Sequence, residues 1–282
     1  MLYYVYSWGC NVAGCNEREM NIEEWIVAFR RSGYDAEKAK AFGDTIYISP
    51  DMYYVERDKD FLENMPVRLV WEKDYDYPVK LSDAFRKKRP GVLFCIGNVA
   101  FLNKPSIFIC GAREASDTGR EIAYKCGRLA AEAGYVVISG YARGVDIAAH
   151  TGAVEGGGNT LALLPYGLAR FSVRRELSEL FNPDNFLVAS ELPPTCGFIV
   201  KGALRRNTLM VGLADAVIVI EPGESGGTWF SAERAADMKR PLFFHEGARP
   251  EIVPRMESMG GERLQVRNGA PVLDGVYERC GG

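Results

Sequence analysis

The chain has 282 residues, of which 47% are hydrophobic and 25% charged, and its formal net charge at pH 7 is -3. This composition is typical of an ordinary globular protein with one sizeable core and a smaller appendage. No apolar run approaches the roughly 20 residues needed to span a bilayer, and the amino terminus lacks the basic flank and long apolar stretch of a secretory signal. We therefore expect a cytoplasmic protein with no membrane partner.

The charge and the cysteines narrow the classes of ligand. A net negative chain has no general attraction for nucleic acid, so a polyanion would have to meet a local basic patch. The seven cysteines are scattered and never spaced as C-x-x-C, which argues against a zinc site or a disulfide framework. We predict no metal site and no cofactor.

Residues 1–65 are predicted to form a small α+β extension of unknown role. Asn21 is a suitable cap for an amphipathic helix from Ile22 to Arg31, whose apolar face would carry Ile22, Trp25, Ile26 and Phe29. A short strand is expected over Thr45 to Ile48. Residues 66–104 are expected to be extended segments that pack on the core, with a strand from Val92 to Ile96.

The central region, residues 105–247, alternates apolar runs with helical patterns such as that from Thr118 to Ala133. The runs are Ser106–Cys110, Tyr135–Ile138, Leu161–Leu164, Phe186–Ala189, Ala216–Ile220 and Pro241–Phe244. Near-continuous apolar strands with intervening helices predict an α/β, Rossmann-like parallel sheet with helices on both faces. The tail, residues 248–282, is expected to form at most a hairpin of Arg263–Val266 with Pro271–Val276.

Two glycine-containing turns directly follow the first two strands of this region. Their candidate phosphate-binding residues are Gly111 and Arg113 in the first turn, and Ser139, Gly140, Arg143 and Gly144 in the second. Such turns lie at the carboxyl ends of parallel strands, where helix amino termini present free N–H groups to an anion. Two alternatives stay open: Arg113 pairs with Glu114 or Asp117, or the glycines serve turn geometry alone.

Asp146 and His150 are one helical turn apart and share a helix face. The pair is compatible with acid–base chemistry. We favour a structural interpretation, in which Asp146 accepts backbone N–H groups near the helix start and His150 is a partly buried ring.

Two further segments complete the predicted pocket. A basic cluster of Lys201, Arg205, Arg206 and Asn207 lies at the start of a helix that runs through Leu213. Cations there oppose the helix dipole, which favours an anionic partner over a solvated basic face. The last phosphate-type loop contains Ser225, Gly226, Gly227 and Thr228. It either grips nucleic acid or only shapes the pocket, and the nearby Glu221 and Glu224 argue against an unshielded phosphate at its rim.

Ordered blocks over about 180 residues resemble the DNA-processing protein A (DprA/Smf) family, within the SLOG group of Rossmann-like domains. They include ICGAR, ISGYARGVDIAAHTGA, SELPP and RRNTLMVGLADAVIVIEPGESGGTWFSAERA. The resemblance implies binding of single-stranded DNA, loading of a RecA-type recombinase during DNA uptake, recombination or repair, and a homodimer without established catalysis. The family pattern F-P-x-R-N-R aligns with residues 203–208, where Arg206 and Asn207 match but the aromatic, the proline and the second arginine do not.

Two other functions are compatible with the same group of domains. One is a nucleotide-binding sensor in a defence or stress system, which would use the same pocket. The other is a nucleotide phosphoribohydrolase resembling the LOG enzymes, whose P-G-G-x-G-T-x-x-E loop supplies a catalytic glutamate. Here that position is Ser231, and Glu233 follows two residues later. Since two positions turn a helix by about 200°, Glu233 is expected to face away from the loop, and we predict no catalysis.

Overall fold

The computed structural model of the protein describes residues 21–32 and 52–280. Within them, the centre is a nine-stranded sheet in the order β1-β2-β6-β5-β4-β3-β7-β8-β9. Its strands are β1 (Arg68–Trp71), β2 (Val92–Gly97), β3 (Ser106–Gly111), β4 (Val136–Ser139), β5 (Thr160–Leu163), β6 (Phe186–Ser190), β7 (Ala216–Ile220), β8 (Leu242–His245) and β9 (Glu262–Arg263). All neighbours from β6 to β9 pair in parallel, whereas β2 pairs antiparallel with both β1 and β6. The predicted α/β class is confirmed.

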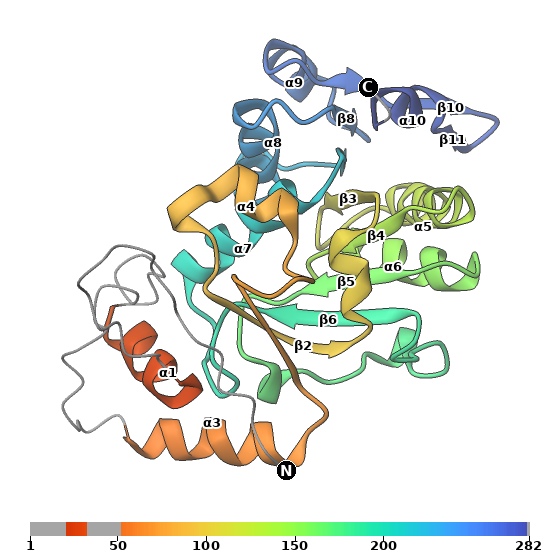
Figure 1. Ribbon diagram of the computed structural model, residues 1–282. Helices are drawn as coiled ribbons and strands as arrows, with labels where there is room; N and C mark the ends of the chain where they lie inside the picture. Colours follow the sequence, from red (N-terminus) through yellow and green to blue (C-terminus); the bar gives the residue numbers. More distant parts are fainter. Residues whose placement is uncertain (1–20, 33–51, 281–282) are drawn as a thin grey trace.

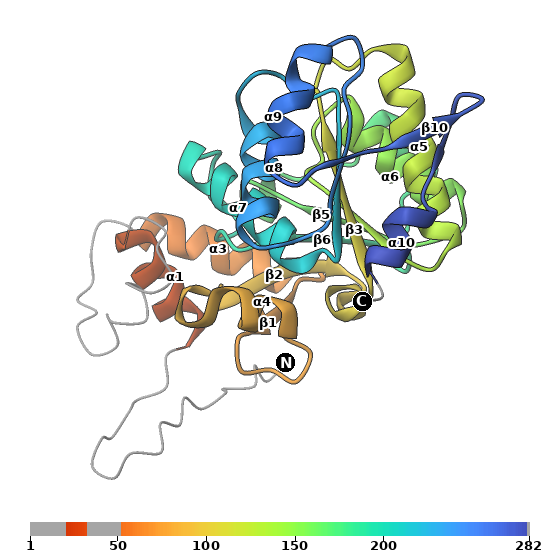
Figure 2. The same ribbon diagram turned by 90° about the horizontal axis from the view of Figure 1, so that it is seen from above.

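Helices cover both faces of this sheet. They are α4 (Val79–Phe85), α5 (Asp117–Glu132), α6 (Val145–Glu155), α7 (Val200–Leu213), α8 (Gly227–Asp237), α9 (Val253–Ser258) and α10 (Asp274–Cys280). One apolar cluster joins the sheet to α5, α6 and α10, and another joins its opposite face to α4, α7, α8 and α9. Figures 1 and 2 show the strands between α5 and α6 on one side and α7 and α8 on the other.

The apolar runs became strands because both of their faces are buried. In β3, Ile107 and Ile109 belong to the cluster under α5, whereas Phe108 and Cys110 belong to the opposite cluster. A strand that is covered on both sides needs no polar alternation, so a continuous apolar run is its signature. All six predicted strands are present, with ends that differ by at most one residue.

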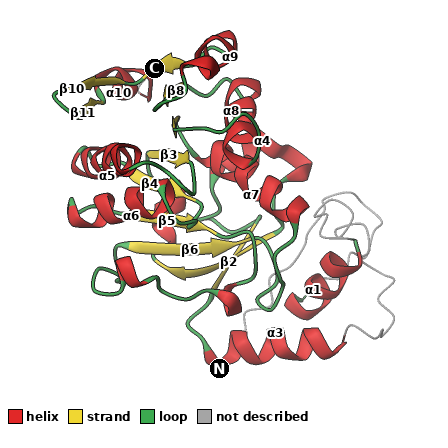
Figure 3. Ribbon diagram, turned by 180° about the vertical axis from the view of Figure 1, so that it is seen from behind, coloured by secondary structure: helices red, strands yellow, loops and turns green. Residues whose placement is uncertain are grey.

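The amino-terminal helix α1 (Ile22–Arg31) has the predicted bounds and the predicted Asn21 cap, which Glu24 completes as a capping box. It packs beside α3 (Met52–Asn64), and a 2.7 Å ion pair joins Arg30 to the buried Asp58. Both helices lie on the β2 side of the sheet, away from α9 and α10 (Figure 3). The predicted strand Thr45–Ile48 lies outside the described residues.

Two expectations about the flanks of the core were wrong. Residues 66–104 are not wholly extended, because Val79–Phe85 form α4, which buries Leu81 against α7. The tail forms the expected hairpin, β10 (Gln265–Arg267) with β11 (Ala270–Val272), but also α9, α10 and strand β9. Its apolar side chains Leu273 and Val276 become buried on the α5 face, which short-range patterning does not reveal.

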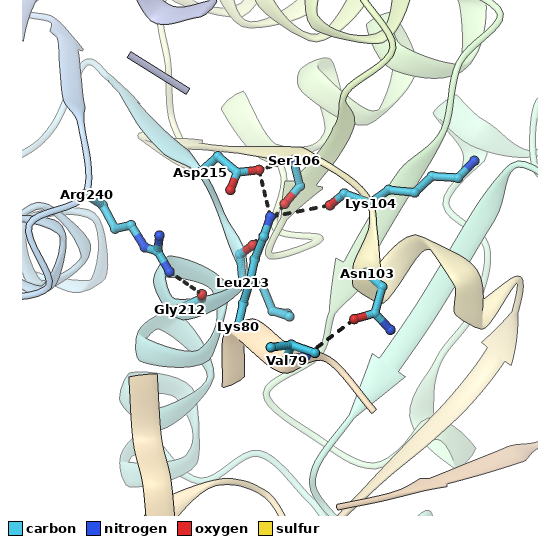
Figure 4. Close-up of polar contacts among 9 residues, drawn as sticks. All are labelled: Val79, Lys80, Asn103, Lys104, Ser106, Gly212, Leu213, Asp215 and Arg240. Carbon is cyan, nitrogen blue, oxygen red and sulfur yellow. Dashed lines mark hydrogen bonds and ion pairs between the residues drawn. The ribbon is translucent and has the colours of Figure 1, made fainter. Parts of the chain in front are cut away.

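The amino ends of β3 and β7 are joined by a polar cluster that Figure 4 shows in detail. The Asp215 carboxylate accepts hydrogen bonds from the Ser106 N–H at 2.8 Å and from the Lys80 ammonium of α4 at 2.7 Å. The Ser106 hydroxyl donates to the Leu213 carbonyl at 3.0 Å. This edge of the sheet is therefore closed by the protein's own side chains. None of the helices in the described part of the chain is long and apolar enough to cross a bilayer.

Candidate functional site

The opposite, carboxyl edge of the sheet brings the three predicted turns together. The Ala112 N–H after β3 donates to the Ile220 carbonyl at the end of β7, at 3.2 Å. The Val145 N–H at the start of α6 donates to the Ala112 carbonyl, also at 3.2 Å. The Thr228 hydroxyl of α8 donates to the Gly111 carbonyl at 3.0 Å. Segments more than 100 residues apart in sequence thus form one continuous surface.

The glycines of the first two turns are required by close packing. A Cβ on Gly111 would lie 2.1 Å from the Ile220 carbonyl oxygen, and one on Gly140 would lie 2.1 Å from Nη1 of Arg206. Gly144 has a φ of 83° and faces the Ala112 and Arg113 carbonyls. Protein atoms fill the space beside each glycine. The structure therefore gives these residues the geometric role that the sequence left open as an alternative.

Ser139 also has a packing role. Its side chain is buried, and its hydroxyl donates to the Ile109 carbonyl at 2.7 Å. This bond joins β4 to β3 where the two strands end. The expectation that the Ser139 hydroxyl faces a bound phosphate is not compatible with this arrangement.

Two charged residues, the buried Asp146 and the partly buried Arg206, lie beneath the second turn. Nη1 of Arg206 donates to the carbonyls of Gly140 at 2.8 Å and Leu163 at 2.9 Å, while Asp146 accepts the Ala142 N–H at 3.1 Å. Burial raises the pKa of Asp146, and the Arg206 charge opposes that shift. Burial lowers the pKa of Arg206 to about 10, against the effect of Asp146. Arg206 therefore ties the ends of β4 and β5 together, and its predicted phosphate contact gives way to a structural one.

His150 takes no part in this pair. Its Nδ1 lies 2.6 Å from the Thr160 hydroxyl, which donates to the Val137 carbonyl, so Nδ1 must carry the proton. The ring is fully buried between Tyr141 and Phe186, and burial lowers its pKa to about 3. His150 is neutral and has a structural role, but its ring is fully buried, whereas the structural interpretation expected a partly buried one.

The basic cluster on α7 divides into residues with different surroundings. Arg205 lies 3.4 Å from the Glu191 carboxylate, donates to the Lys88 carbonyl, and stacks 4.9 Å from the Phe85 ring centroid. It is thus a packing cation between α7 and the segment after α4, whereas the sequence placed it in the pocket. Lys201 is exposed.

Asn207 connects α7 to the start of α8, because its amide donates to the Gly227 carbonyl at 2.9 Å. The amino terminus of α8 is open: Ser225, Gly226 and Gly227 are exposed, and no side chain caps the helix. Nothing lies within 4 Å of a Cβ built on Gly226, whose φ is 99°. The unpaired N–H groups at the start of α8, and the positive end of the α8 dipole, face the surface.

The exposed cations of the edge are Arg113 and Arg143, from the first and second turns. Arg143 lies 3.5 Å from Glu114, and both side chains are largely exposed, so this pair is weak. Glu114, which the sequence offered as an alternative partner of Arg113, thus pairs with Arg143. Arg113 lowers the pKa of Arg206 through its charge, which places it on the same side of the sheet.

The position that holds the glutamate of the LOG pattern lacks an acid. The Ser231 hydroxyl donates to the Gly227 carbonyl at 2.9 Å. Glu233 accepts the Trp229 indole N–H at 3.0 Å and lies 3.2 Å from Arg255 of α9, which also donates to the Glu224 carbonyl at 3.4 Å. Among the described residues, no group of three His, Cys, Asp or Glu side chains is placed to hold a metal ion.

One surface residue was not found by sequence reasoning. Phe198, just before α7, is 57% exposed, and its neighbour Val200 is 68% exposed. Both lie beside Lys201 in the chain. The sequence signal for an exposed Phe198 was its position between Gly197 and the start of α7. Pattern analysis assigns such an aromatic residue to the core, so the signal was missed.

Comparisons with known proteins agree with this architecture. The chain is 32% identical to DNA processing protein DprA of Streptococcus pneumoniae over 174 residues, which cover 61% of this chain and 60% of that protein. It is 28% identical to Protein Smf of Escherichia coli over 236 residues, covering 79% and 61%. The chain thus spans about three fifths of the length of these relatives.

Two solved structures share the fold. DprA from Streptococcus pneumoniae matches with a TM-score of 0.65 and 24% identity, over 86% of this chain and 89% of that one. DprA from Helicobacter pylori, whose structure addresses a single-stranded DNA binding mode, matches with a TM-score of 0.60 and 24% identity, over 71% and 91%. The family model of DNA recombination-mediator protein A matches residues 68–279. Since this match covers well over half of the chain, the protein belongs to the DNA recombination-mediator protein A family, as the resemblance predicted.

Proposed function

We propose that this protein binds single-stranded DNA at the carboxyl edge of its sheet and serves DNA processing without catalysing a reaction. Family membership and the DNA-binding relative from Helicobacter pylori support the ligand class. The observation that carries the proposal is a group of exposed cations. Arg113 and Lys201 lie on segments that contact the open amino terminus of α8, and Arg143 lies on the second turn, which contacts the first.

The electrostatics of this edge favour a phosphate backbone. The buried charges Asp146 and Arg206 compensate each other, so they add little to the outer field. The exposed arginines and the uncapped α8 are then the local basic patch that a net acidic chain needs in order to attract a polyanion.

The exposed Phe198 favours a single strand over a duplex. It provides an aromatic surface beside Lys201, on which an unpaired base can stack for about 1–3 kcal/mol. A duplex hides its base faces and cannot bring its phosphates to recessed backbone N–H groups. Phe198 thereby offers an aromatic in place of the one that residues 203–208 lack.

A titration of fluorescent single-stranded and duplex DNA of equal length tests the proposal. Binding of the single strand should be tighter, and its log affinity should fall with log salt with a slope of about -2, for about three neutralised phosphates. A slope near zero, or a preference for duplex, would remove this edge as the DNA site.

The chemistry of the α8 start supports the part of the proposal that assigns no catalysis. Ser231 replaces the acid of the LOG pattern, and Glu233 is engaged by Trp229 and Arg255. Incubation with nucleoside monophosphates should release no free base. Release at an enzymatic rate that is lost in Glu233→Gln would contradict this part of the proposal.

The remaining features of the proposal come from the family: a cytoplasmic homodimer that assists a RecA-type recombinase. Strand β8 is not a free edge for pairing with a second copy, because β9 pairs with it. Sedimentation at tens of micromolar should give a dimer, and a RecA-type recombinase should load faster on coated single strands when the protein is added. A monomer would contradict the proposed homodimer, and an unchanged loading rate would contradict the proposed assistance of the recombinase.

A further inference from the structure

The Glu221 carboxylate, immediately after β7, occupies the amino terminus of α5. One carboxylate oxygen accepts the Ser116 N–H at 2.8 Å, and the other accepts the Ser116 hydroxyl. The Ser116 oxygen in turn accepts the Gly119 N–H at 2.9 Å. The Ser116 N–H, at the cap position of a 16-residue helix, thus points at a carboxylate that follows a strand more than 100 residues away.

Three separate segments are shaped around this one side chain. A Cβ on Gly119 would lie 2.4 Å from Cδ of Glu221, and a Cβ on Gly247 would lie 2.6 Å from its Cγ. Glu221 itself has a φ of 48°, in the left-handed region that disfavours residues other than glycine and asparagine. Its N–H donates to the His245 carbonyl at 2.8 Å, which holds that conformation in place.

The location is where this type of sheet normally binds an anion. From β3 the chain proceeds to β4 on one side, whereas β7 and β8 lie on the other, so the strand order reverses between β3 and β7. Ligands of open parallel sheets bind outside the strand ends at such a switch point, with phosphate at a helix amino terminus. α5 follows β3 and Glu221 follows β7, so the carboxylate lies at that place.

We propose that Glu221 is a built-in anion that excludes phosphate from the α5 terminus and so prevents the protein from binding free nucleotides there. The carboxylate satisfies the Ser116 N–H at the cap of α5, where a phosphate would bind, and its charge repels a second anion. This specificity acts against small phosphorylated ligands and does not depend on DNA binding at α8 and the exposed arginines. It also argues against the nucleotide-sensor alternative.

The inference is tested by opening the site. Glu221→Gly removes the side chain and relieves the positive φ, so the backbone should keep its course. Inorganic phosphate and AMP are titrated at constant ionic strength, and the amide signals of residues 116–119 are followed by NMR. We expect no saturable shift in the parent protein and binding at least roughly tenfold tighter in Glu221→Gly.

Glu224→Gly is the matched control. It removes the same charge from an exposed residue of the same loop, and residues 116–119 should still show no saturable phosphate shift. Glu221→Asn, a small neutral residue that tolerates a positive φ, repeats the test if the glycine variant does not fold. Saturable phosphate shifts at residues 116–119 in the parent, or a folded Glu221 variant with no gain, would overturn the proposal. Both results can be read without DNA, so they are independent of whether the proposed function holds.

Discussion

The two ends of the parallel sheet differ in how their charges are used. At the amino edge, Lys80, Asp215 and Ser106 bind one another across α4, β7 and β3 (Figure 4). At the carboxyl edge, the inner charges are paired in the same way, but Arg113 and Lys201 remain exposed beside an uncapped helix. The amino termini of α5, α6 and α8 gather at the carboxyl edge, because each of these helices follows the end of a strand.

This difference teaches that proximity to a phosphate-type turn is not sufficient for binding. Asp146 and Arg206 lie directly beneath the second turn, yet their hydrogen bonds hold β4, β5 and α6 together. Only side chains in the outer layer are available to a ligand. We call Asp146, Arg206 and His150 the inner layer, and the exposed Arg113, Arg143, Lys201 and Phe198 the outer layer. The following predictions compare the inner layer and the amino edge with the outer layer.

The largest effect is expected from Arg206→Ala. It leaves the carbonyls of Gly140 and Leu163 without a donor and Asp146 without its counter-charge, which should lower the free energy of unfolding by about 3 kcal/mol. Urea denaturation measures the change. In a double-mutant cycle with Asp146→Ala, the two losses should not add. A loss below about 1 kcal/mol would mean that Arg206 belongs to the outer layer after all.

The buried His150 should make stability depend on pH. Its pKa of about 3 in the folded state lies below the unfolded value near 6.5, so the unfolded chain binds the proton first as the pH falls. Stability from this residue is present above pH 6.5 and is lost between there and about pH 3. From pH 7 to pH 5 the parent should lose about 2 kcal/mol more than His150→Gln does. His245→Gln, at the other histidine of the chain, should keep the parent's pH profile; equal profiles for all three proteins would contradict the assignment.

At the amino edge, Asp215→Ala should affect stability and not DNA. It removes the acceptor of the Ser106 N–H and the partner of Lys80, both partly buried, at a cost of about 1–2 kcal/mol in unfolding free energy. Single-strand affinity measured well below the melting temperature should equal that of the parent. A weaker affinity would show that the two edges are coupled.

At the carboxyl edge the opposite result is expected. Arg113→Ala and Arg143→Ala should each weaken single-strand binding by about fivefold, or about 1 kcal/mol, and flatten the salt slope by about 0.7. Thermal stability should stay within about 0.5 kcal/mol, because both side chains are exposed.

Lys104→Ala is the control for this pair. It removes an exposed cation at the amino edge, where the Lys104 side chain extends away from the polar cluster (Figure 4). Its binding should match that of the parent. If Lys104→Ala weakens DNA binding as much as the arginine variants do, the binding is a general charge effect and not a property of the carboxyl edge.

The smallest effect is expected from Phe198→Leu, which keeps an apolar side chain of similar size but removes the aromatic face. Single-strand affinity should fall about threefold, with an unchanged salt slope, since stacking releases no counterions. A changed slope, or no loss for any base composition, would remove Phe198 from the interface.

The sequence alone determined the elements that depend on local pattern. Apolar runs such as Ala216–Ile220 predicted strands because burial on both faces permits an uninterrupted apolar segment. The Asn21 cap and the α1 bounds followed from short-range hydrogen bonding. The family blocks and the glycine turns located the functional edge, since chain order places each turn after a strand.

Only the tertiary structure decided what each charged side chain does there. Arg205 and Arg206 are neighbours in sequence, but one pairs with Glu191 and the other with the carbonyls of two strands, because helix geometry turns successive residues by about 100°. Glu221 accepts a hydrogen bond from Ser116, 105 positions earlier in the sequence. Strand β9, which pairs with β8, comes from a tail that the sequence predicted to form at most a hairpin. Such contacts are set by the packing of distant segments, so no local pattern in the sequence specifies them.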